Sequence, residues 1–165
     1  MIRQYNMKNG EFLKKVNDMK EIEDSEFSKK QSHIKKKETN EISSLIYINE
    51  EKLLIASYWD STIRIYDEAE SEESVLLKVL SGAHKDSEII SLTYSSKQSL
   101  FASGSANGII ALWDFETGKL EGILKADDSE VTQIEFLDPY PAIATTTSNG
   151  SVYIWGSRLA PARYK

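Results

Sequence analysis

The residues with the greatest chemical potential lie between positions 84 and 114. His84 precedes Ser103 and Ser105, whose alternate spacing places both hydroxyls on one side of an expected strand. A serine nucleophile beside a histidine base would be the catalytic interpretation. A nucleophile elbow, however, requires a turn from a strand into a helix, and no helical periodicity follows Ser105. The sequence therefore favours a structural role for His84 and these serines.

Composition argues against other kinds of chemistry. The 165 residues include no cysteine and two histidines, His33 and His84, which excludes a thiol nucleophile and disfavours a multi-histidine metal site. The formal net charge of −6 argues against non-specific nucleic-acid binding, which depends on clustered cations. No stretch approaches the ~18 apolar residues of a membrane span. We therefore expect a soluble intracellular protein with no cofactor, no metal and no membrane contact.

A strand–turn–strand pattern occurs three times in the chain. The copies read LLIASYWDSTIRIYD, LFASGSANGIIALWD and AIATTTSNGSVYIWG, at residues 53–67, 100–114 and 142–156. The aromatic residues near their ends, Tyr66, Trp113 and Trp155, recur at an interval of roughly 45 residues, which is typical of β-propeller blades. The middle strands are apolar on both sides, as expected where neighbouring blades cover both faces of a sheet. Expected strands cover residues 2–5, 11–16, 42–48, 52–58, 62–66, 75–80, 88–94, 100–105, 109–113, 120–125, 131–136, 142–147 and 151–155.

These residues resemble the WD-repeat family, most closely in HKDSEIISLTYSSKQSLFASGSANGIIALWD at residues 84–114. The resemblance implies an all-β fold, a partial WD-type β-propeller of about three four-stranded antiparallel blades plus part of a preceding blade. We divide the chain into the outer strands of that incomplete blade (1–16), a charged inserted loop or short helix (17–40), three blades of which the last lacks its outer strand (41–157), and a C-terminal tail (158–165).

Blades of this family are held together by a hydrogen-bond chain of His, Ser or Thr, Asp and Trp. The resemblance assigns such roles in the three copies to Ser57, Asp60 and Tyr66; to His84, Ser103, Ser105, Asn107 and Trp113; and to Thr145, Asn149 and Trp155. Asn107 stands where the family prefers Asp. Because the amide lacks the charge that would hold the imidazole, we expect a weaker network.

Three phrases, YWDSTIRIYDE, WDFETGKLEGIL and IEFLDPYPAIATTTSNGSVYIW, are similar to the large WD-repeat proteins of cilia and flagella. Several of those proteins also carry EF-hands, but this sequence has no EF-hand loop, so calcium binding is not implied. The resemblance implies a non-enzymatic scaffold for protein–protein interactions. It would be a structural component of the ciliary axoneme and cytoskeleton, with tubulin, axonemal complexes or other subunits as partners. The alternative is a reader or adaptor module of nuclear, ubiquitin or RNA machinery.

Binding is expected at loops of the blade ends and in the charged insert. The candidate contacts are Trp59, Asp60, Asn107, Asn149, Lys35, Lys36 and Lys37. Aromatic residues suited to base stacking are not interleaved with the lysines, so an acidic protein surface is favoured over RNA. Three blades and part of another cannot close a ring. We therefore expect a piece of a longer chain, a propeller completed by a separate polypeptide, or a dimer.

Overall fold

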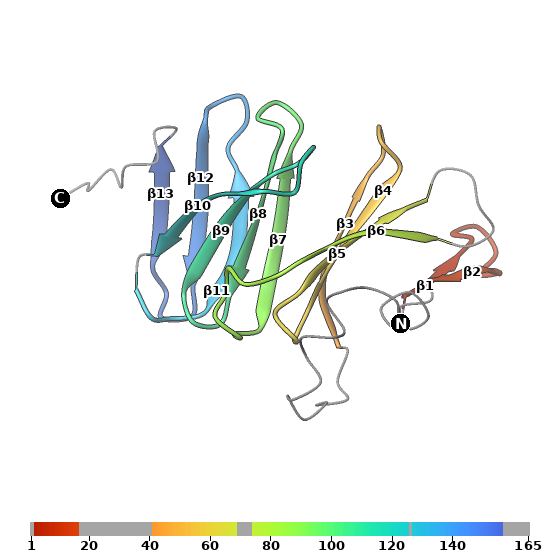
Figure 1. The fold of residues 1–165 in the computed structure, drawn as a ribbon, viewed down its shortest axis with the longest axis horizontal. Helices are drawn as coiled ribbons and strands as arrows, with labels where there is room; N and C mark the ends of the chain where they lie inside the picture. The colour runs from red at the N-terminus through yellow and green to blue at the C-terminus, as the bar shows by residue number, and fades with distance from the viewer. Residues whose placement is uncertain (1, 17–40, 69–73, 126, 157–165) are drawn as a thin grey trace.

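The computed structural model describes residues 2–16, 41–68, 74–125 and 127–156 (Figure 1). All regular elements in these ranges are β-strands, and none of the described segments forms a helix long and apolar enough to cross a membrane. The strands form four antiparallel sheets in the orders β1-β2, β3-β4-β5-β6, β10-β9-β8-β7 and β11-β12-β13. The all-β prediction with four-stranded antiparallel blades is confirmed, and the structure is a partial propeller. The insert 17–40 and the tail 158–165 lie outside the described residues.

Each sheet is a meander in which consecutive strands pair. The first sheet comprises β1 (Ile2–Tyr5) and β2 (Phe12–Val16). The first blade comprises β3 (Ile42–Ile48), β4 (Leu53–Tyr58), β5 (Ile63–Asp67) and β6 (Val75–Leu80). The second comprises β7 (Ile89–Ser95), β8 (Leu100–Ser105), β9 (Ile109–Asp114) and β10 (Leu120–Lys125). The third comprises β11 (Val131–Phe136), β12 (Ala142–Thr147) and β13 (Val152–Gly156). Each observed strand begins and ends within one residue of its expected bounds.

The same turn joins the second and third strands of every blade. The side-chain oxygen of Asp60, Asn107 or Asn149 accepts a hydrogen bond from the backbone N–H two residues later, at 3.1, 3.3 and 3.0 Å. Short Asx side chains favour such turns because they can replace a backbone acceptor. The repeated Asp or Asn of the sequence pattern therefore sets each hairpin.

Apolar cores lie between successive sheets rather than within a single sheet. The core between the first and second blades includes Ile48, Ile55, Ile63, Ile65, Phe101 and Trp113. The core between the second and third includes Ala102, Ile110, Leu112, Val131, Ile134 and Phe136. A third cluster joins Ile2 of β1 to Leu54, Ala56, Tyr58 and Tyr66 of the first blade. Strands β4, β5, β8 and β9 are consequently buried on both faces, as their continuous apolar runs predict.

One glycine decides how closely the second and third blades approach. A Cβ atom at Gly104 of β8 would lie 2.6 Å from Val131 Cγ1 and 2.8 Å from Ile134 Cδ1 of β11. Non-bonded carbon atoms prefer about 3.5–4.0 Å. The missing side chain therefore makes room for β11 to pack against β8.

Candidate functional site

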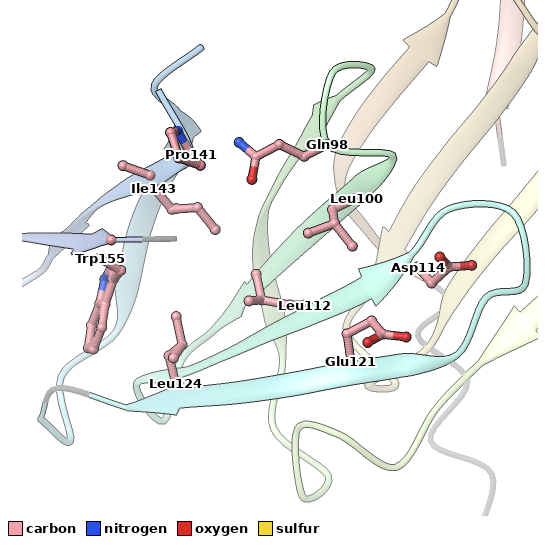
Figure 2. Close-up of a pocket in the computed structure, with 11 residues that line it drawn as sticks. Gln98, Leu100, Leu112, Asp114, Glu121, Leu124, Pro141, Ile143 and Trp155 are labelled. Atoms are coloured by element: carbon pink, nitrogen blue, oxygen red, sulfur yellow. The ribbon is translucent and has the colours of Figure 1, made fainter. Parts of the chain in front are cut away.

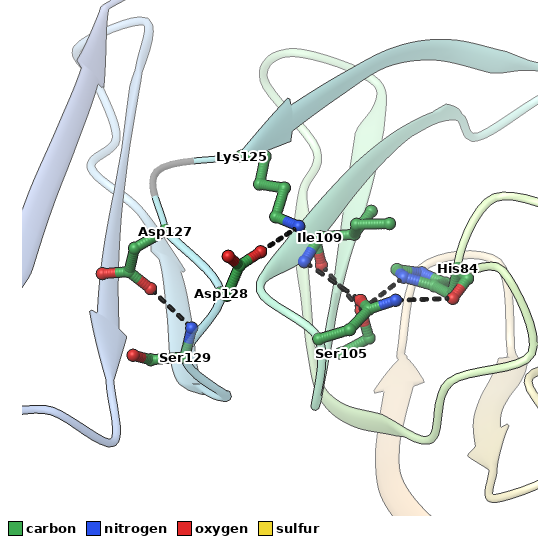
Figure 3. A network of polar contacts seen from close by, with 8 residues as sticks. His84, Ser105, Ile109, Lys125, Asp127, Asp128 and Ser129 are labelled. Carbon is green, nitrogen blue, oxygen red and sulfur yellow. Dashed lines mark hydrogen bonds and ion pairs between the residues drawn. The ribbon is translucent and has the colours of Figure 1, made fainter.

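The central polar network belongs to the second blade and is almost completely buried. His84, 1% exposed, lies between two hydroxyls, with Nδ1 2.9 Å from Ser105 Oγ and Nε2 2.7 Å from Ser103 Oγ. The indole N–H of Trp113 donates to Ser103 Oγ at 2.8 Å. Figure 3 shows the contact between His84, in the connection that leads into β7, and Ser105 at the end of β8. The structure thus brings the predicted histidine, both serines and the tryptophan together.

The donors of this network can be assigned in one consistent order. Ser105 donates to Asn107 Oδ1 at 2.8 Å, so its oxygen is free to accept the Nδ1–H of His84. Ser103 accepts from Trp113 and can donate to Nε2. A neutral imidazole satisfies every partner in this arrangement. Burial lowers the pKa of His84 from 6.5 to about 4, which keeps it neutral.

Asn107 makes a contact that an aspartate could not make. Its Nδ2 donates to the backbone carbonyl of His84 at 3.1 Å, while its Oδ1 accepts from Ser105 and from the turn. The amide therefore ties the His84 connection to the β8–β9 turn without a charge. That the network is weaker than one containing aspartate stays a prediction.

In the first blade two of the three expected residues, Asp60 and Tyr66, form polar contacts with Arg64 and Tyr58. The hydroxyls of Tyr58 and Tyr66 lie 2.9 Å apart in the buried interior. The guanidinium of Arg64 lies 4.0 Å from the centre of the Tyr58 ring and forms a 2.9 Å ion pair with Asp60. Ser57, the hydroxyl expected in this role, lies instead 2.8 Å from the hydroxyl of Ser43.

The register of β4 explains this difference. Side chains alternate across a strand, so Tyr58 and Ser57 face opposite sides of the blade. Counting back from the turn residues Asp60 and Asn107 places Tyr58, rather than Ser57, at the position of Ser105. That alignment is a signal in the sequence by which Tyr58 could have been found.

The third blade has a hydrogen bond from an indole N–H equivalent to that of Trp113, and an aspartate lies in the connection before β11. Trp155 donates to Thr145 Oγ1 at 3.0 Å. Asp127 accepts from the Tyr153 hydroxyl at 2.7 Å and from Asn149 Nδ2 at 3.1 Å. The hydrogen bond from Tyr153, followed by the backbone bond from Ser129 that Figure 3 shows, lowers the pKa of Asp127. Sequence reasoning missed Tyr153 and Asp127 because their contact joins separate elements.

The predicted contact residues differ in solvent exposure and in the hydrogen bonds they already form within the chain. Trp59, which follows β4, leaves 42% of its surface exposed. Asp60, Asn107 and Asn149 all occupy the equivalent turns but are engaged in the hydrogen bonds described above. Lys35, Lys36 and Lys37 lie outside the described residues. Within the described ranges, His, Cys, Asp and Glu side chains form no group of three that could hold a metal ion.

Apolar side chains are exposed on the two outward faces of the blade stack. On β3 of the first blade these are Leu45 and Tyr47, 48% and 52% exposed. On β13 of the third blade they are Val152 and Ile154, 66% and 54% exposed. Leu45 and Tyr47 pair with Ala56 and Leu54, so they lie on the face that β1 partly covers. Both faces therefore offer apolar surface for contact with further structure.

Comparison with known families identifies the repeats. The family profile described as WD domain, G-beta repeat, matches residues 28–67 and 74–114. The chain therefore contains WD40 repeats, and the second match holds the complete His84 network. The first match begins at residue 28, inside the stretch we interpreted as an insert. WD40 repeats generally form non-enzymatic scaffolds that bind other proteins, and the matches support that class for this chain.

Curated relatives fall into different cellular systems. The chain is 25% identical over 132 residues to a Poly(A)+ RNA export protein of Schizosaccharomyces pombe, covering 79% of this chain and 37% of the relative. It is 32% identical over 104 residues to an Intraflagellar transport protein 122 homolog of Danio rerio, covering 63% and 8%. It is 30% identical over 124 residues to a Ribosome biogenesis protein WDR12 homolog of Nematostella vectensis, covering 73% and 28%. The chain thus spans less than two fifths of each of these relatives.

Proposed function

We propose that the protein is a scaffold that contributes WD-type blades to a larger protein assembly. The observation that carries this proposal is the pair of apolar faces, Leu45 with Tyr47 and Val152 with Ile154, at opposite ends of the blade stack. Buried side chains of the second and third blades join neighbouring strands by hydrogen bonds, and the imidazole of His84 lies between two serines. The exposed apolar side chains of β3 and β13 are therefore available for contact with other proteins.

The assembly that we favour is the ciliary or flagellar axoneme and its associated transport complexes, a cytoplasmic and cytoskeletal location. Two observations support this choice: the similarity of three sequence phrases to WD-repeat proteins of cilia, and the 32% identity to an intraflagellar transport protein homolog. Partners would be other protein subunits, including tubulin or axonemal complexes. Trp59 is the candidate contact with the largest exposed apolar surface at the predicted binding turns.

An adaptor in RNA or ribosome machinery is the second candidate. It is favoured by the relatives from RNA export and ribosome biogenesis, of which the first covers the largest share of this chain. In that case contact with protein subunits is still expected, since the net charge of −6 disfavours direct binding to nucleic acid.

Co-sedimentation distinguishes these two candidates. The purified full chain is mixed with salt-extracted axonemes and, separately, with ribosomal precursor particles, and its fraction in each pellet is measured. We expect saturable binding to axonemes and none to the particles; the reverse result would contradict the axonemal proposal in favour of the adaptor. Trp59→Ala should weaken axoneme binding, whereas Tyr140→Ala, which removes a 70% exposed ring from the β11–β12 turn, should not.

A further inference from the structure

Three Asn-Gly sequences occur in the chain, at residues 9–10, 107–108 and 149–150, and each lies in a turn between two strands. An asparagine followed by glycine can lose its side-chain amide without an enzyme, because glycine has no Cβ atom to keep its backbone nitrogen away from the asparagine side chain. The reaction also requires that the turn be accessible and free to move. The structure distinguishes the three turns on both counts.

Deamidation proceeds in two steps. The backbone nitrogen of the glycine first attacks the Cγ atom of the asparagine. A C–N bond forms, the Cγ–Nδ2 bond breaks, and ammonia leaves with the proton of the glycine N–H. Water then breaks either of the two carbonyl–nitrogen bonds of the cyclic imide, which yields aspartate, or isoaspartate with the main chain running through the side chain. Water is the only co-reactant, and either product carries a new carboxylate.

The turn at Asn107 is tightly packed. Its Nδ2 donates to the His84 carbonyl at 3.1 Å, and its Oδ1 accepts from the Ser105 hydroxyl at 2.8 Å. Gly108 is buried, and its N–H donates to the Ser105 carbonyl at 3.1 Å. A Cβ atom at Gly108 would collide with the backbone oxygen of Asp127. The peptide group between Asn107 and Gly108 is therefore held away from the geometry of attack.

The turn at Asn149 has equivalent hydrogen bonds but no neighbour packed against its glycine. Asn149 Oδ1 accepts from the Thr147 hydroxyl at 2.7 Å and from the Ser151 N–H at 3.0 Å. The N–H of Gly150 donates to the Thr147 carbonyl at 3.0 Å. Asn149 and Gly150 are both exposed, and a Cβ atom at Gly150 would meet nothing within 4 Å. Brief local opening of this turn therefore meets no steric obstacle.

A carboxylate at position 149 would face another carboxylate. Asn149 Nδ2 donates to Asp127 Oδ2 at 3.1 Å, and the Tyr153 hydroxyl donates to the same oxygen at 2.7 Å. The hydrogen bond from Tyr153, followed by the backbone bond from Ser129, lowers the pKa of Asp127, so its carboxylate is charged at neutral pH. Loss of the amide would remove a donor and place two like charges at hydrogen-bond distance, which is unfavourable.

The connection that contains Asp127 also contacts the second blade. Its backbone oxygen lies where a Cβ atom of Gly108 would be. On the side of β10 and β13, the described parts of the two blades are instead separated by a cavity of about 330 Å³. Leu112 and Leu124 line this cavity from the second blade and Trp155 lines it from the third (Figure 2). The contact at Asp127 is thus one of those that hold the described parts of the two blades together.

We propose that Asn149 is a site of spontaneous deamidation, and that the new carboxylate releases the connection before β11 from the β12–β13 turn. The change accumulates with the age of the chain and weakens the third blade. Asn9 also lies in an exposed turn and reacts, but its Nδ2 donates to the exposed side chain of Glu11, which can turn into solvent. This inference goes beyond the proposed scaffold function and does not depend on which assembly the blades join.

The first test measures where the purified full chain loses amide groups. The chain is incubated at mildly alkaline pH, digested with trypsin and analysed by mass spectrometry. Cleavage after lysine and arginine places the three asparagines in separate peptides, 9–14, 98–119 and 126–158. In the folded chain we expect Asn149 to react at least about tenfold faster than Asn107, and in concentrated urea we expect similar rates at both.

Two results would overturn this assignment. Equal rates at Asn149 and Asn107 in the folded chain would show that the packing of Gly108 gives no protection. An equally large difference in urea would show that the flanking residues, rather than the structure, set the rates.

The second test measures what the modification does. Anion exchange separates deamidated from unmodified chains, and the peptides identify the modified residue. The chain modified at Asn149 should have a urea unfolding midpoint lower by roughly 0.5 M. The chain modified at Asn9 carries the same change in charge on an exposed turn, so it is the matched control and should keep its midpoint. Equal midpoints for the two modified chains would overturn the proposed release even where Asn149 reacts first.

Discussion

Gly104→Ala tests whether the contact between the second and third blades is as close as the structure indicates. The added methyl group would meet Val131 Cγ1 at 2.6 Å, Ile134 Cδ1 at 2.8 Å and Ser91 Oγ at 2.9 Å. Ser91 already donates to the Val131 carbonyl at 3.3 Å, so this side of β8 has three neighbours that must move together. Each displacement is close to 1 Å relative to an ordinary contact of about 3.5–4.0 Å.

The expected cost follows from two opposing terms. Overpacking a buried site costs roughly 1–3 kcal/mol. Alanine also reduces the conformational freedom of the unfolded chain, which offsets about 0.4–1 kcal/mol. We therefore expect Gly104→Ala to lower the free energy of unfolding by about 1–2 kcal/mol. The free energy of unfolding decreases by about 1–3 kcal/mol for each molar increase in urea concentration. The urea concentration at the unfolding midpoint should therefore fall by roughly 0.5–1 M.

Urea unfolding of the full chain, followed by tryptophan fluorescence, measures this shift. Gly156→Ala is the matched control, because a Cβ at Gly156 of β13 meets nothing within 4 Å. It should leave the midpoint unchanged or slightly raised. Val131→Ala combined with Gly104→Ala supplies a second test, since the smaller neighbour makes room for the new methyl group. The double variant should be at least about 1 kcal/mol more stable than the sum of the single effects implies.

The reasoning would be refuted by a Gly104→Ala chain that is as stable as the wild type with an unchanged urea dependence. An equal loss in Gly156→Ala would show that strand propensity, rather than the approach of β11, is responsible. A coupling energy near zero between Gly104→Ala and Val131→Ala would show that contact with Val131 does not cause the loss of stability.

Three further predictions concern the polar networks. Burial lowers the pKa of His84 from the ordinary 6.5 to about 4. As the pH falls below 6.5, the imidazole therefore takes up a proton in the unfolded state before it does so in the folded state. The free energy of unfolding should consequently decrease between pH 6.5 and pH 4, by up to about 3 kcal/mol. His84→Gln should make the free energy of unfolding, measured by urea titration, less dependent on pH in this range. An equal pH dependence in the variant and the wild type would show that His84 is not its cause. Trp113→Phe, which removes the donor to Ser103, should cost about 1–3 kcal/mol in the same titration. Asn149→Asp should destabilise the chain and raise the pKa of Asp127, which an NMR titration measures, and adding Asp127→Asn should reverse the loss of stability.

Much of the fold follows from short-range patterns. The continuous apolar runs of β4, β5, β8 and β9 predict burial on both faces, and these strands are buried in that way. The repeated Asp or Asn between strands predicts the turns, because an Asx side chain can close a turn with its own neighbours. The spacing of Ser103 and Ser105 places both hydroxyls on one side of β8, the side on which His84 lies.

What the sequence determined by itself is therefore the strand order, the turns and the side of each strand on which a side chain lies, since alternation and turn chemistry act over a few residues. Tertiary structure decided which separate elements come into contact. The hydrogen bond from Tyr153 of β13 to Asp127, in the connection before β11, depends on how the third blade folds. The bond from Ser91 of β7 to the Val131 carbonyl of β11 depends on how the second and third blades pack. The cavity beside β13 depends likewise on the separation of two blades. That separation is set by close contacts such as those around Gly104, and no periodicity along the chain encodes it.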